Sequence, residues 1–310
     1  MKQVLLACLL SGCAASATTN KTSGGLDVAG HLPGDAWLTP PEANAPSATW
    51  TTASTVILDS DGPDGVETYT LIRSVFGPEA IEAPDLYPNN HPGIPHLRED
   101  RDTVVGNHFV FLLHRDSDRD RDTYPGTSDR QRNEIKTYEG SAENLKAREG
   151  ETFLLTWKFK INPAMPVSRN FTHLFQLKGV GGDEQQPLVT FTGEKKNDVD
   201  VFEVRFSPGS GAADQFLATL PWVTVRGQWI AATVQATFGQ TGALSVRLVG
   251  EDGLAILNFS QTGIDLWRGG SFIRPKWGIY RSLADATNLS ADEEDVRFHR
   301  FSISKLVAGP

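Results

Sequence analysis

Apolar and polar side chains alternate along most of the chain from about residue 49 onward, and Gly, Pro and Asp interrupt the alternation. Alternation with a period of two is the pattern of a β-strand that has one face in the core. The clearest alternating runs are 153–161, 202–206, 230–234, 244–248 and 298–303. No long apolar stripe has helical spacing, and no internal repeat is evident. The pattern predicts an all-β sandwich or jelly roll, in which the outer face of one sheet forms a groove suited to a linear polymer.

The first 48 residues differ from the rest in composition. A short apolar run, 4–10, follows Lys2 and is too short to span a bilayer, as in a signal peptide. The string Leu10-Ser11-Gly12-Cys13 resembles the lipobox of bacterial lipoproteins, which implies cleavage before Cys13 and acylation of that residue. An ordinary secretory signal is the alternative. We therefore expect a signal peptide over 1–12, a flexible tether over 13–48 rich in Ala, Ser, Thr, Gly and Pro, and a single domain over 49–310.

The lipobox resemblance also implies a location. The mature protein would be lipid-anchored in the bacterial cell envelope, in the periplasm or at the outer-membrane surface, and would contact the membrane only through its anchor. Both cysteines lie within the first 13 residues, so the folded domain has no disulfide and no thiol nucleophile.

The net charge of −9 argues against nucleic acid as a partner, because an acidic surface repels polyanions. An acidic protein can still bind an anionic glycan through a local basic cleft. Three segments, 132–136, 171–178 and 276–281, supply such a cleft. Their apolar positions face the core, including Phe171, and this parity puts the intervening polar side chains on the opposite face. The polar positions are Arg132, Glu134, Lys136, Gln176, Lys178, Lys276 and Tyr280, with Gly278 leaving room beside the tyrosine for a ligand.

These three segments resemble the motifs of jelly-roll polysaccharide lyases. Jelly-roll alginate lyases carry Arg-x-Glu, Gln-x-His and Tyr-Lys-x-Gly-x-Tyr in this order. The present chain reads Arg132-Asn133-Glu134, Gln176-Leu177-Lys178 and Pro275-Lys276-Trp277-Gly278-Ile279-Tyr280. It departs from the pattern at Lys178, where His is expected, and at Pro275, where Tyr is expected. The string from Lys276 to Arg281 is closer to the heparin lyase I and glucuronan lyase group, and the resemblance covers roughly residues 100–305.

The resemblance implies cleavage of a uronic-acid polysaccharide by β-elimination, without a required cofactor. Such a reaction needs a group that neutralises the uronate carboxylate, a base that takes the C5 proton and an acid that protonates the leaving oxygen. Arg132, Gln176 and one lysine, such as Lys178, suit the first role. Tyr280 suits the acid, and its serving in both proton transfers is the alternative. The residues expected to bind or orient substrate are Lys276, Glu134, Lys136 and Arg281.

The base is open, because Lys178 occupies the position of the family histidine. His108 and His114 bracket a core run, 109–113, and share its outer face, so both are candidates. His173 lies on a motif strand but has core parity unless a β-bulge shifts it. A structural role is the alternative for each of them.

A charged loop, 116–122, alternates aspartates with arginines before Arg132. Asp116, Asp118 and Asp120 resemble a calcium loop, although the Gly and Glu of an EF-hand are missing. A solvated rim loop that borders the groove is the alternative.

Three other function classes stay open. A glycoside hydrolase on the same sandwich would need two carboxylates on one strand face, and the contiguous acids 292–295 do not provide them. A non-catalytic glycan-binding module is a second alternative, since Gly227-Gln228-Trp229 and the strands that follow it resemble concanavalin-like sandwiches. A structural envelope protein is the third.

Overall fold

The computed structural model describes residues 49–121 and 129–309. The predicted signal peptide, the lipidation site Cys13 and the tether all lie outside these residues. Within them, no helix is long and apolar enough to cross a membrane. The elements are β1 Trp50–Leu58, α1 Thr68–Phe76, β2 Ile81–Glu82, β3 Leu97–Asp102, β4 Gly106–Leu113, β5 Arg130–Lys136, β6 Thr152–Ile161, β7 Thr172–Val180, β8 Val189–Lys196, β9 Val199–Phe206, β10 Gln215–Pro221, α2 Trp222–Val225, β11 Ile230–Thr237, β12 Gly242–Val249, β13 Ala255–Ile264, β14 Phe272–Ser282 and β15 Glu294–Ala308, with short 3₁₀ turns at Pro84–Leu86, Glu143–Leu145 and Ala286–Asn288.

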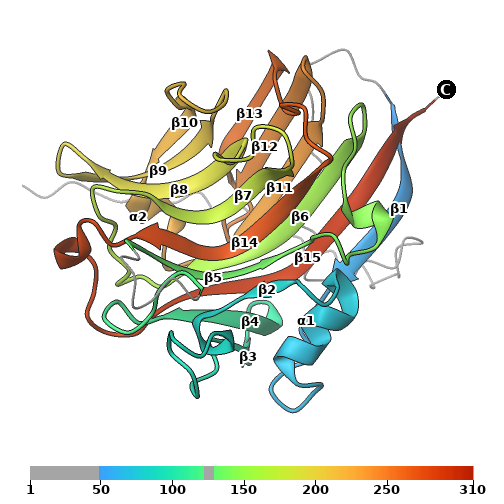
Figure 1. The fold of residues 1–310 in the computed structure, drawn as a ribbon. Coiled ribbons are helices and arrows are strands. Elements are labelled where there is room, and N and C mark those ends of the chain that lie inside the picture. Colours follow the sequence, from blue (N-terminus) through green and yellow to red (C-terminus); the bar gives the residue numbers. More distant parts are fainter. Residues whose placement is uncertain (1–48, 122–128, 310) are drawn as a thin grey trace, which may run out of the picture.

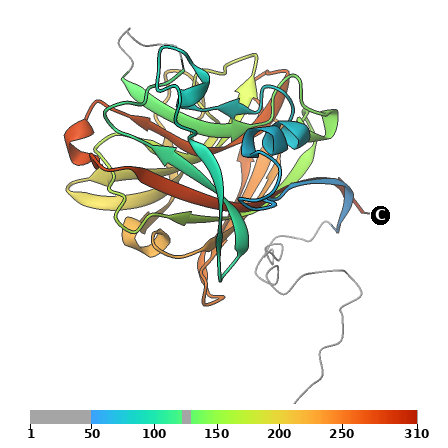
Figure 2. The same cartoon turned by 90° about the horizontal axis from the view of Figure 1, so that it is seen from below.

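Two antiparallel sheets form a sandwich, which confirms the predicted fold class (Figures 1 and 2). One sheet runs β13-β12-β11-β6-β15-β4-β3, with β1 also paired to β15. The other runs β10-β9-β8-β7-β14-β5-β2. All the alternating runs of the sequence are strands. The three motif segments become β5, β7 and β14, which are neighbours at the centre of the second sheet.

The core lies between the sheets and is rich in aromatic rings. Trp157 of the first sheet packs on Phe175 of the second at a ring-centroid distance of 4.6 Å. Trp277 packs on Phe301 at 5.0 Å. All four side chains are almost completely buried, and burial of large apolar groups is the main force that joins the two sheets.

A β-bulge in β7 decides which side chains face outward beside β14. The pairing of β7 with β8 shifts between His173 and Phe175, and Leu174 and Phe175 both lie in the core. The bulge therefore reverses the alternation before Leu174. As a result His173 lies on the outer face, and Phe171 stacks on its ring at 4.5 Å. The expectation that Phe171 faces the core was wrong for this reason.

Gly278 serves close packing of two strands. Its φ is +142°, and a Cβ at this position would lie 2.1 Å from the backbone oxygen of Asn133 on β5. The expectation that Gly278 leaves room for a ligand was therefore wrong, because the space is filled by the neighbouring strand.

Candidate active site

Polar residues of β5, β7 and β14 lie side by side on the outer face of the second sheet. The register pairs Lys276 with Lys136 and Tyr280 with Arg132 across β14 and β5. Across β14 and β7 it pairs Lys276 with Gln176. The predicted motif residues thus converge. We call this set the polar face: Arg132, Glu134, Lys136, His173, Gln176, Lys178, Arg274, Lys276 and Tyr280.

Two buried carboxylates hold the lysines of the polar face. Glu82, on the edge strand β2, accepts hydrogen bonds from Lys136 and from Lys276, both at 2.8 Å. Glu134 lies 2.5 Å from Lys276 Nζ and accepts a hydrogen bond from the Gln176 amide at 2.5 Å. Burial raises the pKa of Glu82, but the cations Lys276, Arg132 and Lys136 outweigh burial and hold that pKa well below its ordinary value. Ion pairs and hydrogen bonds to Glu82 and Glu134 therefore fix the positions of the two lysines.

Arg132 is clamped between acids and lies over the catalytic candidate Tyr280. Its guanidinium donates to Asp120 at 2.7 and 3.2 Å and to Glu134 at 2.5 Å. Its Cζ lies 3.7 Å from the centroid of the Tyr280 ring. The Tyr280 hydroxyl accepts a hydrogen bond from Arg130 at 3.0 Å. Positive charge therefore lies on the face and at the hydroxyl of this half-buried tyrosine.

Burial and crowding of like charges weaken proton binding by the lysines of the polar face. Burial and the nearby Arg132 lower the pKa of Lys276 to about 8. Burial, Arg132 and Arg274 also lower the pKa of Lys178, which is half-buried and open to a ligand. Binding of an anion would stabilise these charged side chains strongly, because its negative charge offsets the repulsion between neighbouring cations.

His173 lies beside Tyr280, with ring centroids 5.9 Å apart. Its Nδ1 lies 2.8 Å from Thr192 Oγ1. Burial, followed by the positive charges of Arg205 and Arg132, lowers the pKa of His173 well below its ordinary value. The ring is therefore neutral at neutral pH and able to accept a proton.

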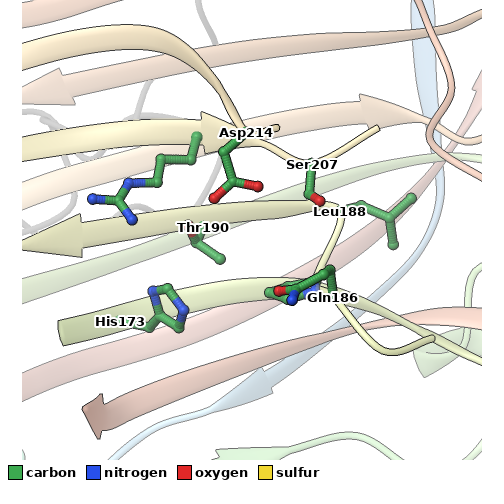
Figure 3. A pocket seen from close by; sticks show the side chains of 8 residues that line it. His173, Gln186, Leu188, Thr190, Ser207 and Asp214 are labelled. Atoms are coloured by element: carbon green, nitrogen blue, oxygen red, sulfur yellow. The ribbon is translucent and has the colours of Figure 1, made fainter. Parts of the chain in front are cut away.

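A pocket opens next to His173 on the same face (Figure 3). His173 and Thr190 supply its floor from β7 and β8, and Arg205 joins them from β9. The remaining lining residues are Gln186, Pro187, Leu188, Ser207 and Asp214. The pocket adjoins His173 on the side of β7 that carries β8 and β9, away from β5.

His108 does not reach this face. It lies on β4 of the opposite sheet, fully buried, with its ring 5.3 Å from that of Trp229. Its Nδ1 lies 3.0 Å from the Gly106 backbone oxygen, and its Nε2 lies 3.3 Å from Arg297. The expectation that it borders the groove was wrong, because the outer face of β4 is the outer face of the other sheet.

His114 also lies away from the polar face. It follows β4 and packs its ring against those of His91 and His96, at centroid distances of 5.1 and 5.2 Å. The run 109–113 that precedes His114 is part of β4, and β4 belongs to the opposite sheet. A role as the base at Tyr280 is therefore inconsistent with its position.

The three aspartates of the charged loop point in different directions. Asp116 is exposed and pairs with Arg115 at 2.8 Å. Asp118 is buried against His91 and His96, whereas Asp120 binds Arg132. The three carboxylates therefore do not converge on one point as the oxygens of a calcium loop do, and the exposed Asp116 fits the alternative of a solvated rim loop.

Arg281 is buried between the two sheets. Its Nε donates to Gln131 at 2.9 Å, and its guanidinium pairs with Glu294 of β15. It is fully buried, so the expectation that it binds substrate was wrong. Its alternation with Trp277 and Ile279 puts it on the core side of β14.

The roles of Glu82, Asp120 and Arg274 at the polar face were not predicted from the sequence. Glu82 lies on a two-residue strand, and no periodic pattern marks so short an element. Asp120 had been considered only as a calcium ligand. Arg274 extends the row of Lys276 by two residues on β14, and strand parity alone could have found it.

A scan against protein-family models gives no match, and no curated protein matches this sequence. Among solved structures, the chain is similar to the marine PL-14 alginate lyase from Aplysia kurodai, with a TM-score of 0.51 and 9% identity over 82% of this chain and 98% of that one. Alginate lyase Aly36B matches with a TM-score of 0.48 and 11% identity over 82% and 97%. The endo-β-1,4-glucuronan lyase from the fungus Trichoderma reesei matches with a TM-score of 0.46 and 13% identity over 82% and 95%. The chain thus has the jelly-roll fold that the sequence predicts.

Proposed function

We propose that this chain is a polysaccharide lyase that cleaves a uronic-acid-containing polysaccharide, glucuronan or a related uronan, by β-elimination. The observation that carries the proposal is the juxtaposition of His173 and Tyr280 on a cationic face. Their rings lie 5.9 Å apart, and the lysines 178 and 276 lie on the same face. The fold it shares with an alginate lyase is consistent with this chemistry but does not by itself assign it.

Each step of the elimination has a group to perform it. Lys178, which is half-buried, neutralises the uronate carboxylate, and this makes the C5 proton acidic enough to remove. The buried Lys276, which is paired with Glu82 and Glu134, adds positive charge behind this position without contacting the substrate. Neutral His173 takes that proton as the general base. The electrons of the C5–H bond form the C4–C5 double bond, and the C4–O bond to the next sugar breaks. Tyr280 donates its proton to the leaving oxygen, and a proton from His173 or solvent restores it.

The supporting residues hold this geometry in place. Arg132 fixes the Tyr280 ring from one side, and Arg130 donates to its hydroxyl. Glu134 and Glu82 keep Lys276 and Lys136 in position. A site whose groups are already oriented loses little free energy to reorganisation in the transition state.

The same contacts argue against a glycoside hydrolase. A hydrolase needs a carboxylic acid that stays protonated beside a second, free carboxylate. Glu82 and Asp120, which border the polar face, are paired with its cations, and their pKa values are lowered. Neither can keep a proton at neutral pH to give to a leaving group.

A panel of uronans and neutral glycans tests the proposal. We expect the wild-type chain to generate the ultraviolet absorbance of a C4–C5 unsaturated uronate from at least one uronan and from none of the neutral glycans. New reducing ends without that absorbance would indicate a hydrolase. Binding to a uronan without any cleavage would favour the glycan-binding module, and either result would overturn the lyase assignment.

A further inference from the structure

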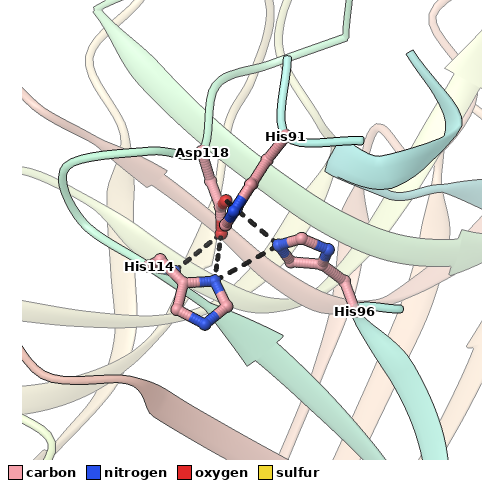
Figure 4. Close-up of side chains that lie close together, drawn as sticks. All are labelled: His91, His96, His114 and Asp118. Atoms are coloured by element: carbon pink, nitrogen blue, oxygen red, sulfur yellow. Dashed lines mark hydrogen bonds and ion pairs between the residues drawn. The ribbon is translucent and has the colours of Figure 1, made fainter. Parts of the chain in front are cut away.

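Three histidines and one aspartate converge at the end of β4, outside the polar face (Figure 4). His91 and His96 lie before β3, and His114 and Asp118 follow β4. Their potential ligand atoms all lie within 4.8 Å of one another. The proposed elimination uses none of these side chains.

Four distances between ligand atoms in this cluster, 2.6–3.4 Å, lie near the ligand separation of a small tetrahedral site. His96 Nε2 lies 3.3 Å from His114 Nδ1 and 3.0 Å from Asp118 Oδ1. Asp118 also lies 2.6 Å from His91 Nδ1 and 3.4 Å from His114 Nδ1. Zinc–nitrogen bonds of about 2.0–2.1 Å in a tetrahedron separate neighbouring ligands by about 3.3–3.4 Å.

Outer contacts orient two of the imidazoles, as they do in protein metal sites. The Nδ1 of His96 lies 3.1 Å from Asp85, so its Nε2 is the nitrogen that faces the cluster. Asp85 in turn accepts hydrogen bonds from the Tyr69 hydroxyl at 2.9 and 2.8 Å. The Nε2 of His114 lies 3.0 Å from Glu293, which leaves its Nδ1 to face inward.

We propose that His91, His96, His114 and Asp118 bind one Zn²⁺ ion as a closed, structural site. Three imidazole nitrogens with a single carboxylate suit zinc, whereas calcium prefers an all-oxygen shell. Four protein ligands fill a tetrahedral shell, so the ion has no open position for a substrate.

The site would join two loops next to the polar face. It links the segment 87–96 to the segment 114–121, which carries Asp120 two residues after the ligand Asp118. Asp120 is the residue that holds Arg132. Zinc would therefore fix the loop that positions Arg132. The proposed zinc site does not depend on the identity of the polymer that the chain cleaves.

Metal content and thermal unfolding of the tag-free chain test the proposal. We expect about one zinc per wild-type chain after equilibration with zinc chloride and desalting. We also expect a rise in Tm of about 5–10 °C over chelator-treated protein at zinc concentrations 100-fold above Kd. Replacing the partly exposed His91 disturbs the fold less than replacing a fully buried ligand, so His91→Gln is the main variant. It should lose most of the bound zinc.

Asp118→Asn and Asp116→Asn form a matched pair, because both remove one charge from the same loop. The first should lose zinc, and the second should retain it, since Asp116 is exposed and pairs with Arg115. Replacement by Co²⁺ should give the intense visible absorption of a tetrahedral site in the wild-type chain. A wild-type chain that neither retains zinc above the level of His91→Gln nor gains Tm on zinc addition would overturn the proposal and leave the cluster as a set of histidine–carboxylate pairs.

Discussion

Replacement of Arg281 distinguishes a structural ion pair from a substrate contact. Arg281 and Glu294 pair between the two sheets, and both are almost completely buried. Removing one partner of a buried pair typically costs about 3–5 kcal/mol, because the other charge is left without compensation. We therefore expect Arg281→Met to lower the free energy of unfolding by about 3–5 kcal/mol. For a domain of this size the loss corresponds to a Tm about 6–20 °C lower.

The double variant gives the sharper test. One nitrogen of Arg281 and one oxygen of Glu294 have no hydrogen-bond partner among the described residues, so the pair is already imperfectly satisfied. Replacing both with apolar residues, as in Arg281→Met with Glu294→Leu, should recover most of the lost stability, because such exchanges are often neutral or stabilising. Chemical denaturation of the wild type, both single variants and the double variant would give the coupling energy.

The pH dependence follows from Glu294. Burial raises the pKa of Glu294, and Arg281 partly opposes that effect. Without Arg281 the folded-state pKa rises further above the unfolded value, so the folded chain binds the proton more tightly. Stability of Arg281→Met relative to the wild type is therefore greatest at low pH and declines as pH rises through the raised pKa. A variant as stable as the wild type that loses only affinity for the uronan would refute this account and restore Arg281 as a substrate-binding residue.

Three further changes test the polar face. His173→Gln should abolish most of the elimination rate while leaving uronan affinity intact. Because the pKa of His173 is depressed, wild-type kcat/KM should persist below pH 6.5. A loss of kcat/KM on acidification that begins at or above pH 6.5 would contradict His173 as the general base. Glu82→Gln should destabilise the fold by about 3–5 kcal/mol in denaturant titrations, since Lys136 and Lys276 lose their shared partner, and should move the alkaline limb of activity to lower pH. Gly278→Ala should lower Tm strongly, because its Cβ would meet the Asn133 oxygen. Gly263 also has a positive φ, but a Cβ there would point into open space, so Gly263→Ala should lower Tm less. Equal losses of Tm would show that the backbone φ, and not the contact with Asn133, causes the effect.

Strand parity correctly predicted most of the residues that share the polar face. Alternation correctly put Arg132, Glu134 and Lys136 on one face of β5, because each residue there follows the regular period of two. The same rule, applied strictly, puts Arg281 in the core beside Trp277 and Ile279. Arg281 was expected to bind substrate because it is basic, although its strand parity already predicted burial.

The rest of the site depends on features that leave no periodic signal. A bulge at Leu174 turns His173 outward, and its location depends on pairing with β8 and β14. Glu82 reaches the face from an edge strand of two residues. His108 lies on β4 and His114 directly follows it, but the parity of a strand cannot tell which of two sheets the strand joins. All three features depend on pairing between strands that are far apart in the chain, and the local sequence pattern does not show that pairing.

The most direct test of the lyase account is the rate of unsaturated-product formation by Tyr280→Phe on the uronan that the wild type cleaves. The variant removes the hydroxyl and keeps the ring beneath Arg132, so the fold and the affinity for the polymer should change little. Tyr138→Phe, which removes a hydroxyl from a ring that contacts Lys136 and Arg274, is the matched control. We predict a loss of about 10²–10⁴-fold in kcat for Tyr280→Phe and a near-normal rate for the control. Retention of the wild-type rate by Tyr280→Phe would contradict the proposed acid and, with it, the assignment of the active site.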